Sequence, residues 1–348
     1  MSDTAPRRTP ALARLRGENN EGVIALSIVA LAMVIGTLNP DFWSISTVFS
    51  VLRNSMVEVV LALGVLLVIV SGGIDVSFPA IAIFAAYTTV VIARNGDFDP
   101  GAVGAFLMAA VIGVLLGLVN AGLIAGFRLP TLIVTLGTQG IFRGVLLAYI
   151  GSKYIAELPA SVDALSTRDL ITIQQGNGTL TRLHVFIIPV VVVCVLVGLL
   201  LRRTMIGRGI YALGGDAESA RRAGFPIVRL QVFIYTCVGL LAGLAGMMHV
   251  TLSRNANPYE LVGTELDVIA AVVLGGASIL GGRGSVTGTV LGVVLISLIK
   301  NSLVLMGVPG AWQRAAVGLL LLIGVTVQAL GARRRARASV NQPAEVAA

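Results

Sequence analysis

The residues of this sequence that could do chemistry are few, and the most informative of them lie in Gly72-Gly73-Ile74-Asp75. Two glycines interrupt an apolar run there, and Ser77 and Pro79 follow the acid, so we expect the backbone to break and to leave polar groups that need partners. A carboxylate costs at least ~2.5–3.5 kcal/mol at the centre of a helix surrounded by lipid. Asp75 therefore either lines a water-filled pathway or, with Ser77, caps the helix that follows.

A second set of polar side chains lies inside apolar runs. Arg143 is in the run 130–150, and Gln139 precedes it by one helical turn. With Asn120 these side chains could line a polar pathway, or Arg143 could instead extend along its helix to the membrane surface. Asp75, Asn120, Gln139 and Arg143 are therefore the candidates for a pathway or a gate, and the structural alternative stays open for each.

Enzymatic chemistry is not supported by the sequence. A phosphate-binding loop needs Gly-Lys-Ser/Thr, but the two lysines, Lys153 and Lys300, follow Ser152 and Ile299. Gly-x-Ser-x-Gly is missing, and two histidines supply too few ligands for a metal. We expect no catalytic residue, no metal and no cofactor, so any ATP that drives this protein must be hydrolysed by a partner.

The composition describes the elements that must hold these residues. Of 348 residues 56% are hydrophobic and only 12% are charged, and the mean hydropathy is +0.93; charged residues make up ~25% of soluble domains. A water-soluble globule is thereby excluded. The net charge of +8 does not indicate nucleic-acid binding, because the basic residues are scattered over tails and loops. Cys194 and Cys237 lie within apolar runs and are expected to be packing residues.

The hydropathy pattern predicts an all-α polytopic membrane protein with about ten transmembrane helices, since each span needs ~20 apolar residues. The transmembrane domain should cover 22–331, between an N-terminal tail, 1–21, and a basic C-terminal tail, 332–348. The first span has no cleavage site before it and should be retained. The ten apolar segments are 22–38, 56–72, 76–94, 101–126, 130–150, 184–201, 229–250, 264–281, 286–305 and 311–331.

The basic residues orient this topology, because Lys and Arg accumulate in cytoplasmic segments. With both termini inside, 16 arginines fall in inner segments and 6 basic residues fall in outer loops. We therefore expect cytoplasmic N- and C-termini, an external loop at 151–183 and a cytoplasmic loop at 202–228. The cytoplasmic loop contains a run from Asp216 to Arg222 that could form a short helix.

Glycines repeat at four-residue spacing within the predicted spans, which places them on one helix face and allows backbones to approach closely. This pattern predicts either packing alone or helices that move against one another. The glycines concerned are Gly113 with Gly117, Gly122 with Gly126, Gly239 with Gly243, and Gly284, Gly288 and Gly292.

Four motifs together resemble one family. They are Gly-Gly-Ile-Asp-Val-Ser at 72–77, Leu-Pro-Thr to Leu-Gly-Thr at 129–138, Gly-Arg to Gly at 207–224, and Glu-Leu-Asp-Val-Ile-Ala-Ala-Val-Val-Leu-Gly-Gly at 265–276. This set resembles the ribose-type sugar permeases of bacterial ABC importers, over about residues 50–330. Phe-Pro-Ala at 78–80 departs from the family's usual continuation, and 151–159 is more similar to members that carry rhamnose or autoinducer-2.

The resemblance extends to the cytoplasmic loop. Glu218-Ser-Ala220-Arg-Arg-Ala-Gly224 resembles the Glu-Ala-Ala-x-x-x-Gly coupling element of ABC permeases, with Ser219 in place of the first Ala. The resemblance implies a short helix that sits in a groove of the ATPase. The coupling residues that it implies are Gly207, Gly214, Asp216, Glu218, Ala220 and Gly224.

The resemblance implies an inner-membrane permease that pairs with a second permease chain, cytoplasmic ATPase subunits and a periplasmic sugar-binding protein. Its pathway would carry a monosaccharide or similar small polyol inward. The external docking surface would come from 39–54, 151–183 and 251–263. The alternative is a stand-alone secondary transporter or channel for a small polar solute, which would need no coupling element.

Overall fold

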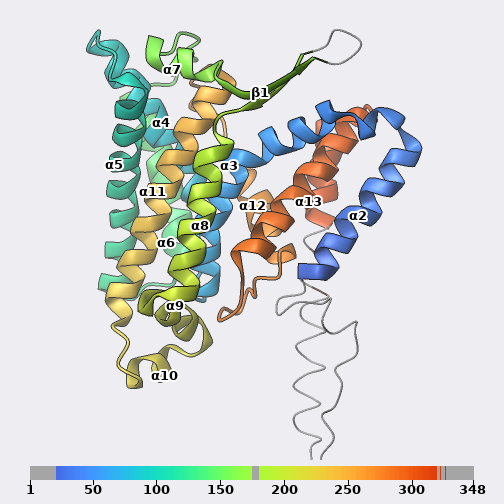
Figure 1. The fold of residues 1–348 in the computed structure, drawn as a ribbon. Coiled ribbons are helices and arrows are strands. Elements are labelled where there is room, and N and C mark those ends of the chain that lie inside the picture. Colours follow the sequence, from blue (N-terminus) through green and yellow to red (C-terminus); the bar gives the residue numbers. More distant parts are fainter. Residues whose placement is uncertain (1–20, 175–179, 320–321, 323–325, 327–348) are drawn as a thin grey trace, which may run out of the picture.

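The computed structural model of the protein describes residues 21–174, 180–319, 322 and 326. Almost all elements are helices, and most run between two ends of the molecule (Figure 1). One end carries a β-hairpin and is called the hairpin end; the other carries the short helix α10, Ala217–Arg222, and is called the α10 end. The predicted tails, 1–21 and 332–348, lie outside the described residues apart from Glu21, which begins a helix.

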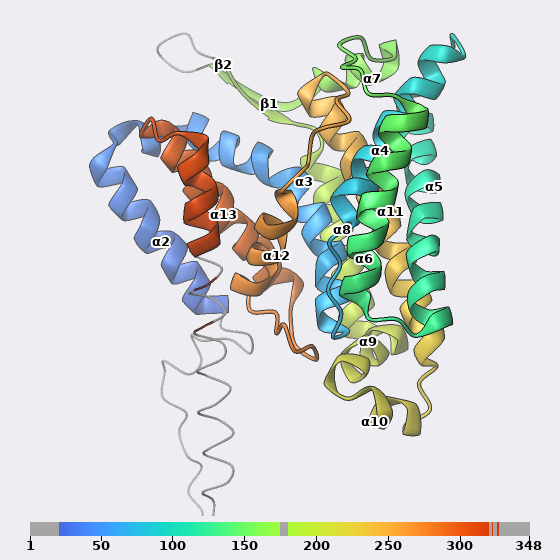
Figure 2. The same ribbon diagram turned by 180° about the vertical axis from the view of Figure 1, so that it is seen from behind.

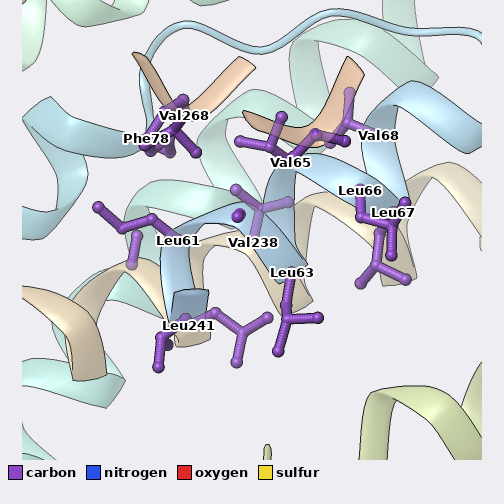
Figure 3. Close-up of a cluster of buried hydrophobic side chains, with 14 of the residues drawn as sticks. Leu61, Leu63, Val65, Leu66, Leu67, Val68, Phe78, Val238, Leu241 and Val268 are labelled. Carbon is purple, nitrogen blue, oxygen red and sulfur yellow. The ribbon is translucent and has the colours of Figure 1, made fainter. Parts of the chain in front are cut away.

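Helix α3, Ile45–Val70, forms the centre of the molecule. It begins at Ser44, whose Oγ accepts a hydrogen bond from the backbone N–H of Thr47 at 3.2 Å, and its second half, residues 59–70, is apolar on every face. A helix that is hydrophobic all round has to be enclosed by others. Figure 3 shows its side chains, among them Leu61 and Leu66, beside Val238. The surrounding helices include α8, Ile187–Arg203, α11, Ile227–Ser253, α12, Thr264–Leu274, and α13, Val286–Leu305.

Helices α4, Phe78–Asn95, α5, Gly101–Ala121, and α6, Thr131–Val145, lie on one side of α3 (Figure 2). Short π-helical turns extend α5 and α6, at η2, Gly122–Gly126, and η3, Leu146–Ile150. Helix α2, Glu21–Leu38, and the 3₁₀ turn η1, Pro40–Trp43, lie on the other side, against α13 (Figures 1 and 2).

The glycine pairs predict one helix crossing correctly. A methyl group at Gly113 of α5 would overlap the carbonyl oxygen of Gly239 of α11, and one at Gly239 would overlap the carbonyl oxygen of Gly113. The two backbones therefore touch, as four-residue glycine spacing allows. Gly122 and Gly126 differ, because nothing lies within 4 Å of a methyl group placed on either.

Six described helices are long and apolar enough to cross a membrane, or seven if α8 and α9, Met205–Gly215, count as one bent span. Apolar side chains also cover the outer face of α5, where Val103, Leu107 and Val111 are more than half exposed. Such a face is stable in lipid and not in water. The protein is therefore a multi-pass, mostly helical membrane protein.

Two predicted spans need comment. The segment 264–281 is not one long helix: α12 covers 11 residues, or about 16 Å at 1.5 Å per residue. Gly276, at φ +94°, follows its end, and a turn over 275–285 continues toward the α10 end. The segment 311–331 is only partly described, with helix over 310–319.

The predicted external loop contains regular structure, so the chain is not purely helical. Helix α7, Ala160–Ser166, precedes an antiparallel hairpin of β1, Asp169–Gln174, and β2, Leu180–His184. Three consecutive β-branched residues, Ile171-Thr172-Ile173, are typical of a strand. The loop also pairs with 251–263, through a bridge between Ile155 and Ala256 and an ion pair between Arg254 and Asp163 at 2.9 Å.

Candidate translocation and coupling sites

The α10 end begins with a sharp bend between α8 and α9. The two helices meet at 72°, and Thr204 at the bend accepts a hydrogen bond from the N–H of Gly207 at 3.0 Å. A methyl group at Gly207 would overlap the carbonyl oxygen of Leu200. Gly207 thus allows α9 to fold back against the end of α8.

Helix α10 is short and has a defined cap at each end. The carboxylate of Asp216 accepts a hydrogen bond from the N–H of Ser219 at 2.5 Å, and this bond holds the pKa of Asp216 below its usual value. Gly224 follows with φ +87°. The N–H of Phe225 donates to the carbonyl of Ala220 at 3.1 Å, and that of Gly224 donates to Arg221 at 2.9 Å. This is a Schellman ending, which favours glycine.

The sides of α10 differ in character. Ala220 is buried, whereas Glu218 is exposed and forms ion pairs with Arg221 and Arg222. Beside α10, a groove of about 810 Å³ lies between the end of η2 and the start of α11. Three arginines line it, namely Arg128, Arg221 and Arg229. The α10 end therefore presents a basic, exposed surface that is anchored by one buried alanine.

Gly214, near the end of α9, contacts two distant segments. A methyl group there would overlap the carbonyl oxygen of Val70, the last residue of α3, and would lie 2.6 Å from the nitrogen of Gly282. The N–H of Gly282 donates to that same carbonyl of Val70 at 2.9 Å. The helix that leads into α10 is thus in backbone contact with the end of α3 and with the turn after α12.

The break predicted at 72–77 is present and its backbone is hydrogen-bonded. Gly72, at φ +82°, ends α3, and α4 starts only at Phe78. The hydroxyls of Thr131 and Thr135 on α6 accept the backbone N–H groups of Ile74 and Val76, at 3.1 and 3.4 Å. The two threonines are four residues apart, so one face of α6 satisfies the freed polar groups.

Asp75 is completely buried in this break. Its Oδ1 accepts hydrogen bonds from the N–H and the Oγ of Ser77, both at 2.7 Å. Asn120, also completely buried, donates from Nδ2 to the Oγ of Ser77 at 2.8 Å. Among the described residues the Oδ2 of Asp75 has no hydrogen-bond partner. The structure therefore brings Asp75 and Asn120 together through Ser77, at the start of α4.

Gln139 and Arg143 form a separate group on α6. Gln139 donates to Oε1 of Glu265 at 2.5 Å, and Arg143 donates to the same oxygen at 3.2 Å. Glu265 is buried in the first turn of α12. Glu265 belongs to the motif at 265–276, and an acid in an apolar run is a signal by itself. No hydrogen bond in the described chain connects this group to Asp75.

A third polar group was not expected from the sequence. Lys300 on α13 lies 2.9 Å from Oε1 of Glu58 on α3 and 2.7 Å from Oδ2 of Asp267 on α12. Ser297 also contacts Glu58, at 3.3 Å. Each of the three charged residues was visible as a charge in an apolar segment, but their sequence separation concealed the contact.

The described residues thus form a multi-pass helical body with a short, capped helix at one end. Residues 47–325 match the model of the family described as "Branched-chain amino acid transport system / permease component". The chain belongs to this permease family. It is a permease subunit of the ABC-importer class, which confirms the resemblance found in the motifs.

Curated relatives agree with this assignment. The chain is 34% identical over 309 residues to the autoinducer 2 import system permease protein LsrC of Yersinia pestis (strain Pestoides F). The matched region covers 89% of this chain and 84% of the relative. LsrC of Yersinia pseudotuberculosis serotype I (strain IP32953) matches with the same identity and coverage. No solved structure matches.

Proposed function

We propose that this chain forms half of the pathway by which an inner-membrane importer takes up a monosaccharide or similar small polyol, of the ribose, rhamnose or autoinducer-2 class. The partners would be a second permease chain, cytoplasmic ATPase subunits and a periplasmic sugar-binding protein. The observation that carries the proposal is α10, capped by Asp216 and Gly224 and exposed on its charged side. A stand-alone transporter would need no coupling element at this place.

In this proposal α10 occupies a groove of the ATPase, and movement of the ATPase reaches α9 and then Val70 through Gly214. The proposed topology has ten spans and both termini in the cytoplasm, so the hairpin end faces the periplasm. The binding protein would dock there, on 39–54, 151–183 and 251–263. The ion pair of Arg254 with Asp163 and the bridge of Ile155 with Ala256 support the last two segments as one surface.

The coupling role can be tested with Gly224→Pro in the complex of permease, ATPase and binding protein. Proline cannot adopt φ +87° and lacks the N–H that Gly224 donates to Arg221. We expect the sugar-stimulated ATPase activity to be lost at normal membrane abundance. Gly198→Ala on α8, where a methyl group has open space, is the control. Full stimulation in Gly224→Pro would contradict the proposal.

Orientation has its own test. In a background without Cys194 and Cys237, a cysteine at Thr167 should react with an impermeant thiol reagent added to sealed cells, and one at Ser219 should not. Both positions are exposed, so accessibility differs only by the side of the membrane. Equal labelling of the two cysteines would overturn the proposed topology.

A further inference from the structure

The hairpin half of the molecule contains a cavity of about 540 Å³ between α3, α11, α12 and α13. Its walls combine apolar residues, such as Val57 and Leu61, with several polar ones. Small-molecule sites in proteins are usually concave spaces of ~300–1,000 Å³ with few, well-placed polar groups. The polar lining includes Arg53, Glu58, His249, Ser297, Lys300 and Asn301.

Glu58 and Lys300 line the cavity, and Asp267 of α12 contacts Lys300 from beside it. Lys300 is held between Glu58 and Asp267, and their side chains are 25%, 22% and 17% exposed. Arg53 adds a second positive charge on the same wall as Glu58. The guanidinium of Arg53 donates to the carbonyl oxygen of Leu252 at 3.2 Å, and Lys300 is paired with Glu58 and Asp267. The site therefore favours a neutral solute, because an anion or a cation would have to compete with these existing contacts.

Helix packing alone does not account for the group. The Nδ2 of Asn301, one residue after Lys300, is enclosed, yet among the described residues no acceptor lies within hydrogen-bond distance. Leaving a buried donor unpaired costs about 1–3 kcal/mol. An oxygen atom of a solute in the cavity would give this donor an acceptor.

We propose that this cavity is the solute-binding site of the permease and that it takes a neutral polyol with adjacent hydroxyl groups. This inference rests on the proposed function and names the residues that contact the solute. Free lone pairs of Glu58 would accept hydrogen bonds from the hydroxyls, and Lys300 and Asn301 would donate to them. The apolar wall at Val57 and Leu61 would contact the C–H faces of the sugar ring.

The test uses cysteines on α13 in the complex, in the background that lacks Cys194 and Cys237. Asn301→Cys should react with an impermeant thiol reagent from the hairpin side. D-ribose, L-rhamnose and autoinducer-2 are the probes, and at least one should slow the reaction in proportion to its occupancy. Ile299→Cys lies at the same depth but does not line the cavity, and should stay unreactive. L-leucine should give no protection.

A second measurement separates this inference from the proposed function. Asn301→Ala should reduce sugar uptake per ATP hydrolysed by about tenfold, which corresponds to ~1.4 kcal/mol, while the loaded binding protein still stimulates ATPase activity. The cavity assignment would be overturned if sugar stimulates the ATPase, sugar does not protect the Asn301→Cys variant and Asn301→Ala takes up sugar normally. That set of results would leave the permease function intact. Protection by L-leucine alone would overturn the substrate class. A complex without any sugar-stimulated ATPase would contradict the proposed function, and protection of the Asn301→Cys variant by sugar would still support the cavity.

Discussion

The two ends of the molecule are built from different interactions. At the α10 end, Gly214, Val70 and Gly282 bring three backbones into direct contact, and the caps of α10 are short local hydrogen bonds. At the hairpin end, side chains from four helices surround an open volume, and Lys300 lies between two carboxylates. Backbone contacts have little freedom to adjust, whereas side chains around a cavity can reorient. The α10 end is thus suited to pass on a displacement, and the hairpin end to admit a solute.

The largest effect should come from Lys300→Met. Breaking a buried ion pair costs ~3–5 kcal/mol, and we expect the lower end because these side chains are about one quarter exposed. The thermal midpoint of the purified chain should fall by several degrees, and uptake should fall with it. Lys300→Arg should retain part of both.

Two controls test that prediction. Lys153→Met removes the other lysine from an exposed position on the hairpin side and should leave the midpoint unchanged. Combining Lys300→Met with Glu58→Gln and Asp267→Asn should restore much of the stability, because no charge is then left unpaired. A Lys300→Met midpoint equal to the original would show that the charges do not hold the hairpin half together.

The next largest effect should come from Gly214→Ala at the α10 end. The added methyl group overlaps the carbonyl oxygen of Val70, and overpacking of this kind costs about 1–3 kcal/mol. We expect reduced coupling of ATPase activity to uptake. Gly215→Ala is the matched control, since nothing lies within 4 Å of its added methyl group. If both variants couple equally well, the backbone contact does not carry the motion.

Local signals explain what the sequence predicted well. The cap at Asp216, the short helix and Gly224 are contiguous, and so is the break at Gly72-Gly73, so each could be read without any knowledge of distant partners. The glycine spacing in α5 and α11 indicated close crossing, although not which helix each would meet. The length of α12 was missed because hydropathy continues past Leu274, while Gly275 and Gly276 end the helix.

Distant contacts explain what was missed. Glu58, Asp267 and Lys300 are separated by more than thirty residues at each step, and only the packing of α3, α12 and α13 brings them together. Gln139 and Arg143 were selected as polar residues, but their shared acceptor, Glu265, was not. Asp75 was selected for its charge, and its surroundings turn out to be local hydrogen bonds at the start of α4.

A smaller effect is expected from Asp75→Asn, since the Asp75 group should depend on hydrogen bonding and not on charge. An amide oxygen can still accept from the N–H and Oγ of Ser77, at a cost of at most a few tenths to ~1 kcal/mol. The rate of uptake should stay within about twofold of the original rate, because a tenfold change in rate corresponds to ~1.4 kcal/mol. Asp75→Ala, which lacks the acceptor, should lose more. If Asp75→Asn abolishes uptake while Asp75→Glu retains part of it, the carboxylate belongs to a gate.

The smallest effect should come from Asp216 at the start of α10. Its pKa is lowered because the carboxylate accepts the N–H of Ser219, so the cap stabilises α10 above the ordinary aspartate pKa and is lost only as pH falls through the lowered value. Asp216 should therefore contribute no pH dependence to coupling between neutral and mildly alkaline pH. Asp216→Asn should behave almost as the original, because asparagine is an equally good cap, and Asp216→Ala should show a modest loss of sugar-stimulated ATPase activity. Equal losses in the two variants would mean that the charge itself contacts the ATPase, and the α10 end would then share the electrostatic character of the hairpin end.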